Sequence, residues 1–302
     1  MCSDFSLFWI VNTGKDRIMY NESDSLKKLK VTMMIKVLLI FGGIIFMQLI
    51  SYMICVLGYV VFGMICGKGY ARALAEVTIL GQSSETNIML AISAISAALS
   101  FIWCTVLYVR SSWREEHVDY KNIFSVKNIS TVFCIGSGCC ILLTFLLSIL
   151  TSLFPDMFKN YTELMSNFEN GNLALTLLYA VFIGPVSEEM IFRGAIFDRV
   201  YTAFPFWKAN VIQAALFGIY HMNIIQGLYA FCLGIVLGLI VKTTGSILCS
   251  MLTHIIFNGT SYLLPVLLGT GLFWVNVIAV IVMLFLVAAG IYGIKFLMRS
   301  LR

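Results

Sequence analysis

Residues 173–197 read LALTLLYAVFIGPVSEEMIFRGAIF, an apolar run that carries two adjacent carboxylates, Glu188 and Glu189. About 20 predominantly apolar residues are enough for a helix to cross the hydrocarbon core of a bilayer. A charged side chain at that depth costs roughly 2.5–3.5 kcal/mol on insertion scales, so such residues are rare and usually functional. The stretch therefore predicts a transmembrane helix with a candidate site inside it. The alternative is that both glutamates only pack against neighbours or cap the helix near the membrane surface.

The composition of the whole chain agrees with a membrane protein. Of 302 residues, 60% are hydrophobic and 12% are charged, and the mean hydropathy is +0.94. A soluble domain has about 45–50% apolar and about 25% charged residues. The net charge of +5 is modest and spread over the loops, which indicates membrane topology and argues against nucleic acid as a partner. Most of the nine cysteines lie in apolar runs without zinc-ligand spacing, so we expect buried free thiols.

Eight apolar runs follow the amino-terminal segment. They cover 37–66, 87–109, 130–154, 172–192, 209–224, 227–241, 246–268 and 273–297. The fifth and sixth are short and closely linked, which predicts a helical hairpin. We therefore expect an all-α fold, a polytopic bundle of about eight transmembrane helices. Residues 1–36 form a polar amino-terminal segment, and residues 37–302 form a single transmembrane domain.

Lysines and arginines alternate between the loops in a way that predicts the orientation. One side holds the amino-terminal basic cluster, Arg193, Arg199 and the basic carboxyl-terminal tail, whereas the acidic loop 156–171 lies on the other side. Both termini are therefore expected in the cytoplasm. On this topology, Glu188 lies about one and a half turns from the cytoplasmic end of its helix, at a depth similar to that of His254.

Spacing along the helices assigns different environments to the two glutamates. Glu189 and Arg193 are four residues apart and share one helix face, so they are placed to form a pair. Glu188 points about 100° away and has no obvious partner on its own helix. This unpaired carboxylate is the better candidate for a base that takes part in proton transfer.

Two histidines downstream complete the candidate set. His221 follows Phe217 by four residues, and His254 precedes Asn258 by four. Asn258 is placed to bond the His254 ring or to donate to a developing oxyanion. Two histidines and a glutamate are also a zinc-ligand set with an open position for water, although the helical HExxH motif is absent. Histidines that are merely satisfied in the core are the structural alternative.

At these residues the chain resembles the CAAX protease and bacteriocin-processing (CPBP) family of intramembrane proteases. Residues 188–193 match its EExxxR motif, residues 217–221 its FxxxH motif, and residues 254–258 its HxxxN motif. The three motifs occur in order and about 30 residues apart. The resemblance covers a core at about 173–259.

The resemblance implies a membrane-embedded endopeptidase of the type that cleaves prenylated CAAX proteins. Carried over, Glu188 and His221 would activate water, and His254 and Asn258 would form the oxyanion hole. Glu189, Arg193 and Phe217 would be supporting residues. We expect no cofactor, because the chain offers few good zinc ligands.

The resemblance also bears on partners and location. The expected substrate is a membrane-associated peptide or a lipidated protein terminus, with membrane lipid as the surrounding partner. Bacterial relatives are linked to bacteriocin immunity, and the short loops favour a multi-pass protein of the bacterial plasma membrane. The sequence does not indicate an oligomeric state.

Two other functions stay open at this point. A non-proteolytic membrane scaffold or regulator on the same fold would tolerate loss of Glu188. A transporter coupled to protons or a metal ion would use Glu188, His221 and His254, and the short fifth and sixth helices favour it. The chain lacks the matching pair of short segments in its two halves that inverted-repeat transporters have.

Overall fold

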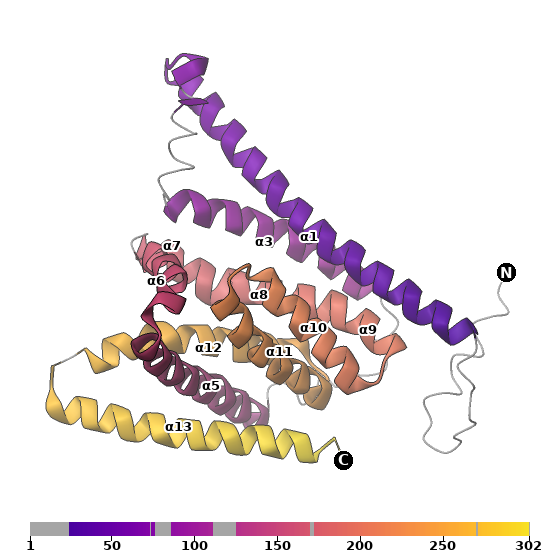
Figure 1. Cartoon of the computed structure of the whole chain (residues 1–302), viewed down its shortest axis with the longest axis vertical. Coiled ribbons are helices and arrows are strands. Elements are labelled where there is room, and N and C mark those ends of the chain that lie inside the picture. The colour runs from indigo at the N-terminus through magenta and orange to yellow at the C-terminus, as the bar shows by residue number, and fades with distance from the viewer. Residues whose placement is uncertain are drawn as a thin grey trace.

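The expected all-α architecture is confirmed. The computed structural model describes residues 24–72, 74–75, 86–110, 125–169, 172–269 and 271–301, and no strand occurs within these ranges. Helices from distant parts of the sequence pack around a central helix that carries the glutamates (Figure 1).

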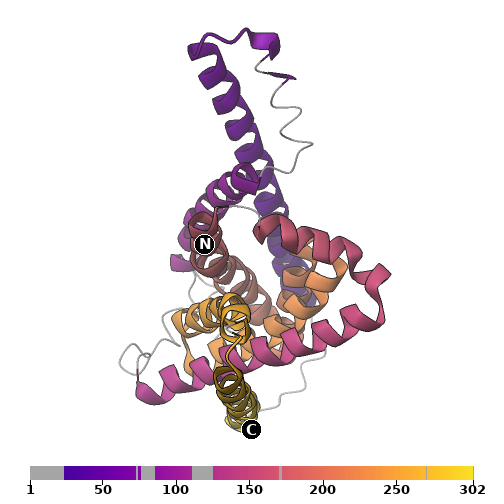
Figure 2. The same cartoon turned by 90° about the vertical axis from the view of Figure 1, so that its left-hand side faces the viewer.

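Helix α1 (Asp24–Ile65) and helix α3 (Thr86–Val109) pack against each other on one side of the bundle. With 42 residues, α1 is about 63 Å long at 1.5 Å per residue, roughly twice the thickness of a hydrocarbon core. Its carboxyl-terminal part extends beyond the other helices (Figures 1 and 2). Residues 24–36 of the expected polar segment form the first turns of α1, and residues 1–23 lie outside the described residues.

Helices α5 (Val126–Leu153), α12 (Ile247–Leu268) and α13 (Phe273–Arg299) form the opposite side. Helix α5 packs against both of the others. Small residues let the backbones approach closely, as membrane helices commonly do. A Cβ built on Gly290 of α13 would lie 2.7 Å from the carbonyl oxygen of Cys134, and one on Gly136 would lie 2.7 Å from that of Thr253.

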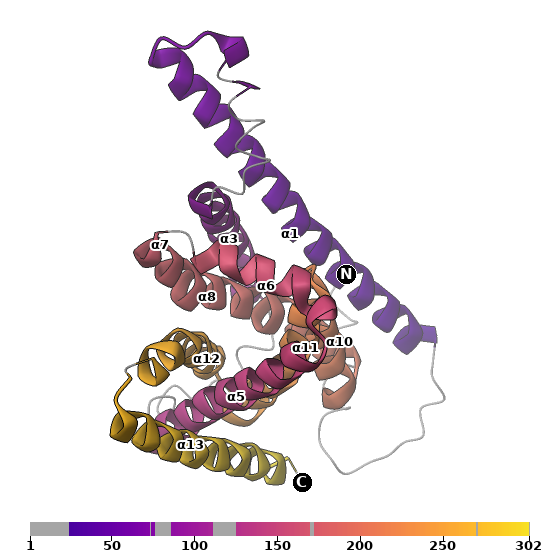
Figure 3. The same cartoon turned by 60° about the vertical axis from the view of Figure 1, so that its left-hand side comes forward.

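The segment 156–171, expected as a loop, is mostly helical. Helix α6 spans Pro155–Glu169, and it begins with a proline, which suits the first turn of a helix because its missing N–H has no partner there. Phe158 is fully buried, whereas neighbours such as Met157 and Lys159 are exposed. This amphipathic helix packs against α11 and the start of the central helix (Figure 3).

The central helix runs without interruption from Leu173 to Ala203, 31 residues. It consists of α7 (Leu173–Leu177), a π-helical turn at Leu178–Ile183, α8 (Gly184–Glu189), a π-helical stretch at Met190–Phe197 and α9 (Asp198–Ala203). All eight residues of the second π-helical stretch are buried, which is typical of a helix enclosed by others.

The expected end of this helix at residue 192, and the placement of Arg193 and Arg199 in a loop, are therefore wrong. The helix continues because both guanidinium groups have partners inside the protein. Arg193 pairs with Glu189, and Arg199 donates to the carbonyl oxygens of Ala195 (2.8 Å) and Leu107 (3.0 Å). Glu188 is consequently the middle residue of the helix, so the expected distance of about one and a half turns from the helix end is wrong.

The expected hairpin is present as α10 (Phe206–Tyr220) and α11 (Ile224–Thr244). The turn lies earlier in the chain than expected, at residues 221–223, because α10 ends at Tyr220 and α11 begins at Ile224. Asn223 caps α11 by accepting a hydrogen bond from the Gln226 N–H at 3.0 Å. A Cβ on Gly218 would lie 2.6 Å from the Gly227 carbonyl oxygen, so the two helices touch through their backbones.

Seven helices are long and apolar enough to cross a membrane within the described ranges. They correspond to seven of the eight expected spans. The eighth, expected at 209–224, is α10, whose 15 residues fall short of the roughly 20 that a spanning helix needs. The chain is an integral, multi-pass membrane protein.

Candidate active site

The carboxylate of Glu189 is the centre of a buried polar cluster. Its Oε1 accepts hydrogen bonds from Arg193 Nη1 at 2.7 Å and from His254 Nδ1 at 2.9 Å, and its Oε2 accepts one from the Ser250 hydroxyl. Glu189, Arg193 and Ser250 have no exposed surface. The predicted pairing of Glu189 with Arg193 is confirmed. A buried carboxylate needs such partners because desolvation of an unpaired charge is costly.

Arg193 is held from three directions. Besides Glu189, its Nη2 donates to the Gly234 carbonyl oxygen of α11 at 3.3 Å, and its guanidinium lies 4.6 Å from the centre of the Phe217 ring. The same Gly234 oxygen accepts from Gln213 Nε2 at 2.9 Å. This geometry fixes the guanidinium against α10 and α11, and through it the central helix.

His254 lies between the two glutamates. Its Nδ1 is bonded to Glu189, and its Nε2 is 3.7 Å from Glu188 Oε2. Because a carboxylate only accepts hydrogen bonds, Nδ1 carries a proton and donates a hydrogen bond to Glu189. Nε2 is then the ring nitrogen that faces Glu188. The Glu188 side chain is 16% exposed, whereas that of Glu189 is completely buried, so Glu188 is the glutamate that an incoming molecule can reach.

The Phe217 ring brings the two histidines to one place. It makes edge contacts with His221 at 4.9 Å and with His254 at 5.8 Å between ring centres. His221 comes directly after the last residue of α10, and its Nδ1 is 2.8 Å from the Phe217 carbonyl oxygen. A carbonyl only accepts, so Nδ1–H donates and Nε2 of a neutral ring is free to accept a proton.

Asn258 bonds neither the His254 ring nor another site side chain among the described contacts. Its Nδ2 donates to the carbonyl oxygen of Ala180, 2.7 Å away in the first π-helical turn. An i→i+5 turn disturbs the regular α-helical hydrogen bonding and commonly occurs at functional sites. Asn258 therefore supports the central helix about two turns before Glu188 and connects it to α12.

Three tyrosine side chains lie near enough to Glu188 for its charge to act on them. Tyr179, Tyr220 and Tyr229 all interact electrostatically with its carboxylate. Two of them also contact peripheral helices: Gln48 of α1 donates to the Tyr220 hydroxyl at 3.2 Å, and the Tyr229 ring packs edge-on against Tyr161 of α6 at 6.3 Å. Burial raises the pKa of Tyr161, so this phenol stays neutral at physiological pH.

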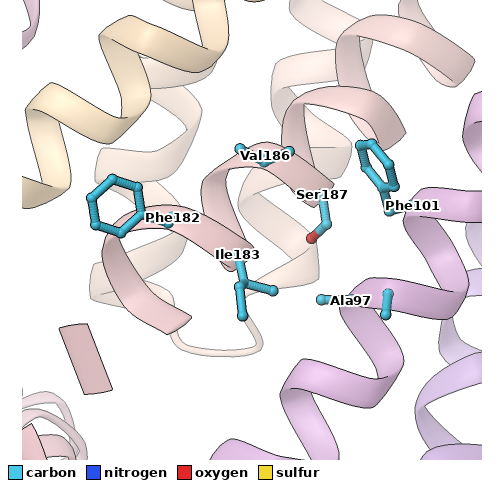
Figure 4. A pocket seen from close by; sticks show the side chains of 7 residues that line it. Ala97, Phe101, Phe182, Ile183, Val186 and Ser187 are labelled. Atoms are coloured by element: carbon cyan, nitrogen blue, oxygen red, sulfur yellow. The ribbon is translucent and has the colours of Figure 1, made fainter. Parts of the chain in front are cut away.

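An apolar cavity of about 290 Å³ lies between α3 and the central helix (Figure 4). Its lining residues are Ala97, Ala98, Phe101, Phe182, Ile183, Val186 and Ser187. The only hydroxyl among them, that of Ser187, donates to the Gly184 carbonyl oxygen at 3.0 Å. The cavity thus offers an apolar surface on residues adjacent in sequence to Glu188.

Among the described residues, no three His, Cys, Asp or Glu side chains are arranged to hold a metal ion. Both oxygens of Glu189 already accept hydrogen bonds from protein donors. The expectation that the protein needs no metal cofactor stays a prediction.

Side-chain contacts connect six of the seven sequence-predicted site residues, whereas Asn258 contacts the Ala180 backbone instead. The structure also adds residues that sequence reasoning missed. Ser250 precedes His254 by four residues, so the helical spacing that linked His254 to Asn258 was also a signal for Ser250. No sequence pattern could have indicated that the backbone oxygens of Gly234 and Ala180 accept hydrogen bonds from site residues.

Together, the fold and the site define a multi-pass membrane protein with a carboxylate–histidine site enclosed by its helices. Residues 170–260, which contain all three motifs, match the family described as "Type II CAAX prenyl endopeptidase Rce1-like". Over 84 residues the chain is 29% identical to "Putative membrane peptidase YdiL" of Bacillus subtilis (strain 168), an alignment that covers 28% of this chain and 34% of that protein. The aligned segment therefore spans about a third of the relative's length. No solved structure matches the chain significantly. At the level of the family, the segment that holds the site is similar to membrane proteases of the CAAX type.

Proposed function

We propose that this protein is an intramembrane endopeptidase that cleaves a membrane-associated peptide or a lipidated protein terminus by a glutamate-dependent, metal-free mechanism. The observation that carries the proposal is the pairing of a partly accessible carboxylate, Glu188, with His254 at the middle of a membrane-spanning helix. The match of residues 170–260 to the Rce1-like family supports the same reaction class.

In the proposed reaction, Glu188, assisted by His221, takes a proton from a water molecule. The resulting hydroxide adds to the carbonyl carbon of the scissile peptide bond. The C–N bond then breaks, and the proton held by Glu188 passes to the leaving amine. A free Nε2 on His221 suits it to accept a hydrogen bond from the same water and so to orient it for Glu188.

The negative charge that develops on the substrate carbonyl oxygen must be stabilised by hydrogen-bond donors. Nε2 of a protonated His254 would supply one, and Glu189 would stabilise this imidazolium through Nδ1, as the aspartate does in a Ser-His-Asp triad. The amide of Asn258 has two N–H groups, so contact with Ala180 leaves the second for the oxyanion. With His254 protonated, the two carboxylates are balanced by two cations, His254 and Arg193.

The relative from Bacillus subtilis favours placement in a bacterial plasma membrane. A role in bacteriocin immunity or peptide maturation fits the same reaction. The apolar cavity beside the central helix suits a substrate that arrives through the lipid phase.

The test is cleavage of a quenched, lipidated peptide library by purified wild-type protein and by Glu188→Gln. We expect the variant to lose activity by more than about a hundredfold, the range found for general acid–base groups, while its thermal unfolding stays unchanged. Glu163→Gln, on the exposed surface of α6, is the matched control and should cleave normally.

The same assay with a strong chelator tests the metal-free mechanism. Retained cleavage is expected. Loss of cleavage on chelation would instead show that a metal ion is needed and would assign the histidines the role of metal ligands. Equal cleavage by wild type and Glu188→Gln would contradict the proposal and favour the non-proteolytic scaffold.

A further inference from the structure

We propose that Ser250 is a positioning residue, which orients the Glu189 carboxylate so that the His254 ring presents Nε2 to Glu188. This inference deepens the proposed function and rests on it for its kinetic part. It begins with how the two Glu189 oxygens are used. Oε1 is shared by Arg193 and His254, whereas Ser250 is the donor that the structure gives to Oε2.

The Glu189 carboxylate can turn about its terminal bond, because that torsion is broad and roughly two-fold. Hydrogen bonds to Oε1 alone leave this rotation poorly restrained. A donor on Oε2 fixes the plane of the group and therefore the direction in which Oε1 offers its lone pairs. Ser250 comes from α12, the helix that also carries His254, so one helix holds the ring and the hydroxyl that orients its acceptor.

The burial of the group makes this contact important. Ser250 and Glu189 have no exposed surface, and His254 is 3% exposed, so water cannot replace the missing donor from the outside. A buried acceptor that loses its partner pays the full cost of desolvation. Without the hydroxyl, we expect Glu189 to rotate toward Arg193 and to weaken its bond to His254 Nδ1.

The kinetic test uses Ser250→Ala, Ser250→Cys and a control, Ser100→Ala. Ser100 is a buried serine of α3 whose hydroxyl has no hydrogen-bond partner among the described residues. We expect kcat of Ser250→Ala to fall roughly tenfold, the value of one hydrogen bond to a charged group, with little change in KM. Cysteine is nearly as small as serine and its thiol is a weaker hydrogen-bond donor, so kcat of Ser250→Cys should lie between those of the wild type and Ser250→Ala. This variant also keeps the test possible if Ser250→Ala does not fold.

A second readout does not depend on catalysis. The chain has three histidines, so the ring ¹⁵N signals of His254 can be assigned by comparing labelled protein with a His254→Gln variant. The wild type should show a protonated Nδ1 in a strong hydrogen bond, and Ser250→Ala should shift that resonance, whereas Ser100→Ala should not.

The outcomes separate this inference from the proposed function. A shifted His254 resonance in a protein that cleaves no peptide would support the positioning role and contradict the proteolytic one. Unchanged His254 signals and an unchanged kcat in Ser250→Ala would overturn the positioning role. Equal loss of kcat in Ser250→Ala and Ser100→Ala would overturn it too, because it would show a general effect of removing a buried hydroxyl.

Discussion

At the scale of single residues, the two adjacent glutamates have separate tasks. Glu189 is completely buried and has three protein donors, whereas Glu188 is partly exposed and faces His254. The difference arises from the helix itself, since neighbouring side chains point about 100° apart. One carboxylate is therefore enclosed by protein donors, and the other is the one that we propose to react.

Loss of Arg193 should destabilise the protein more than loss of an exposed arginine. Arg193→Ala leaves Glu189 as a buried carboxylate without its cation, which costs about 3–5 kcal/mol in comparable buried pairs. The measurement is denaturant unfolding in detergent micelles. Arg299→Ala, in the exposed last turn of α13, should change the free energy of unfolding by less than about 0.5 kcal/mol. Similar free energies of unfolding for the two variants would show that the Glu189–Arg193 pair does not stabilise the protein.

Removal of the Asn258 amide should also weaken the fold. Asn258→Ala leaves the partly buried Ala180 carbonyl oxygen without this donor, and the loss of one such hydrogen bond costs about 0.5–1.5 kcal/mol. Unfolding in micelles measures the change, with the exposed Asn160→Ala of α6 as control. If Asn258→Ala were as stable as the control, its contact with Ala180 could not be supporting the central helix.

At the scale of helices, the site is assembled by close backbone contact between α10 and α11. The close pairs are Gly218 with Gly227, Ala214 with Gly234, and Asn210 with Gly238. As the residue number rises in one helix it falls in the other, so the two helices run antiparallel. This register brings the Gly234 carbonyl oxygen to Arg193 and Gln213.

A methyl group at this contact should separate the helices. In Gly218→Ala the new Cβ would lie 2.6 Å from the Gly227 carbonyl oxygen, which is backbone and cannot turn away. We expect a loss of about 1–3 kcal/mol, as for other overpacked sites, and a parallel loss of activity. Gly58→Ala, which meets nothing within 4 Å in α1, is the matched control and should be neutral or slightly stabilising. A stable, active Gly218→Ala protein would disprove the tight contact.

At the scale of the whole molecule, the number of crossings decides where the termini lie. Seven spans alone would place them on opposite sides of the membrane. Helix α10 adds a reversal of direction, because it runs antiparallel to α11. The start of α1 and the end of α13 lie at the same end of the bundle (Figure 1), so both termini are expected on one side of the membrane. Their cytoplasmic location stays a prediction.

This topology predicts opposite labelling of two engineered cysteines. In a cysteine-free background, Lys159→Cys on α6 should react with a membrane-impermeant maleimide added to intact cells. Arg299→Cys at the end of α13 should react only after the membrane is permeabilised. Labelling of both from the same side would show that α10 does not reverse the chain across the membrane.

The sequence by itself determined the membrane class, the positions of most helices and the residues of the three motifs. These features are local, because hydropathy and helical spacing depend only on neighbours along the chain. The pairing of Glu189 with Arg193 could be predicted for this reason. Only the tertiary structure decided that the central helix continues past Arg193, that Ser250 joins Glu189, and that Asn258 bonds Ala180. Each of these contacts joins separate helices or depends on their packing, and burial of a charged residue becomes favourable only once such partners are in place.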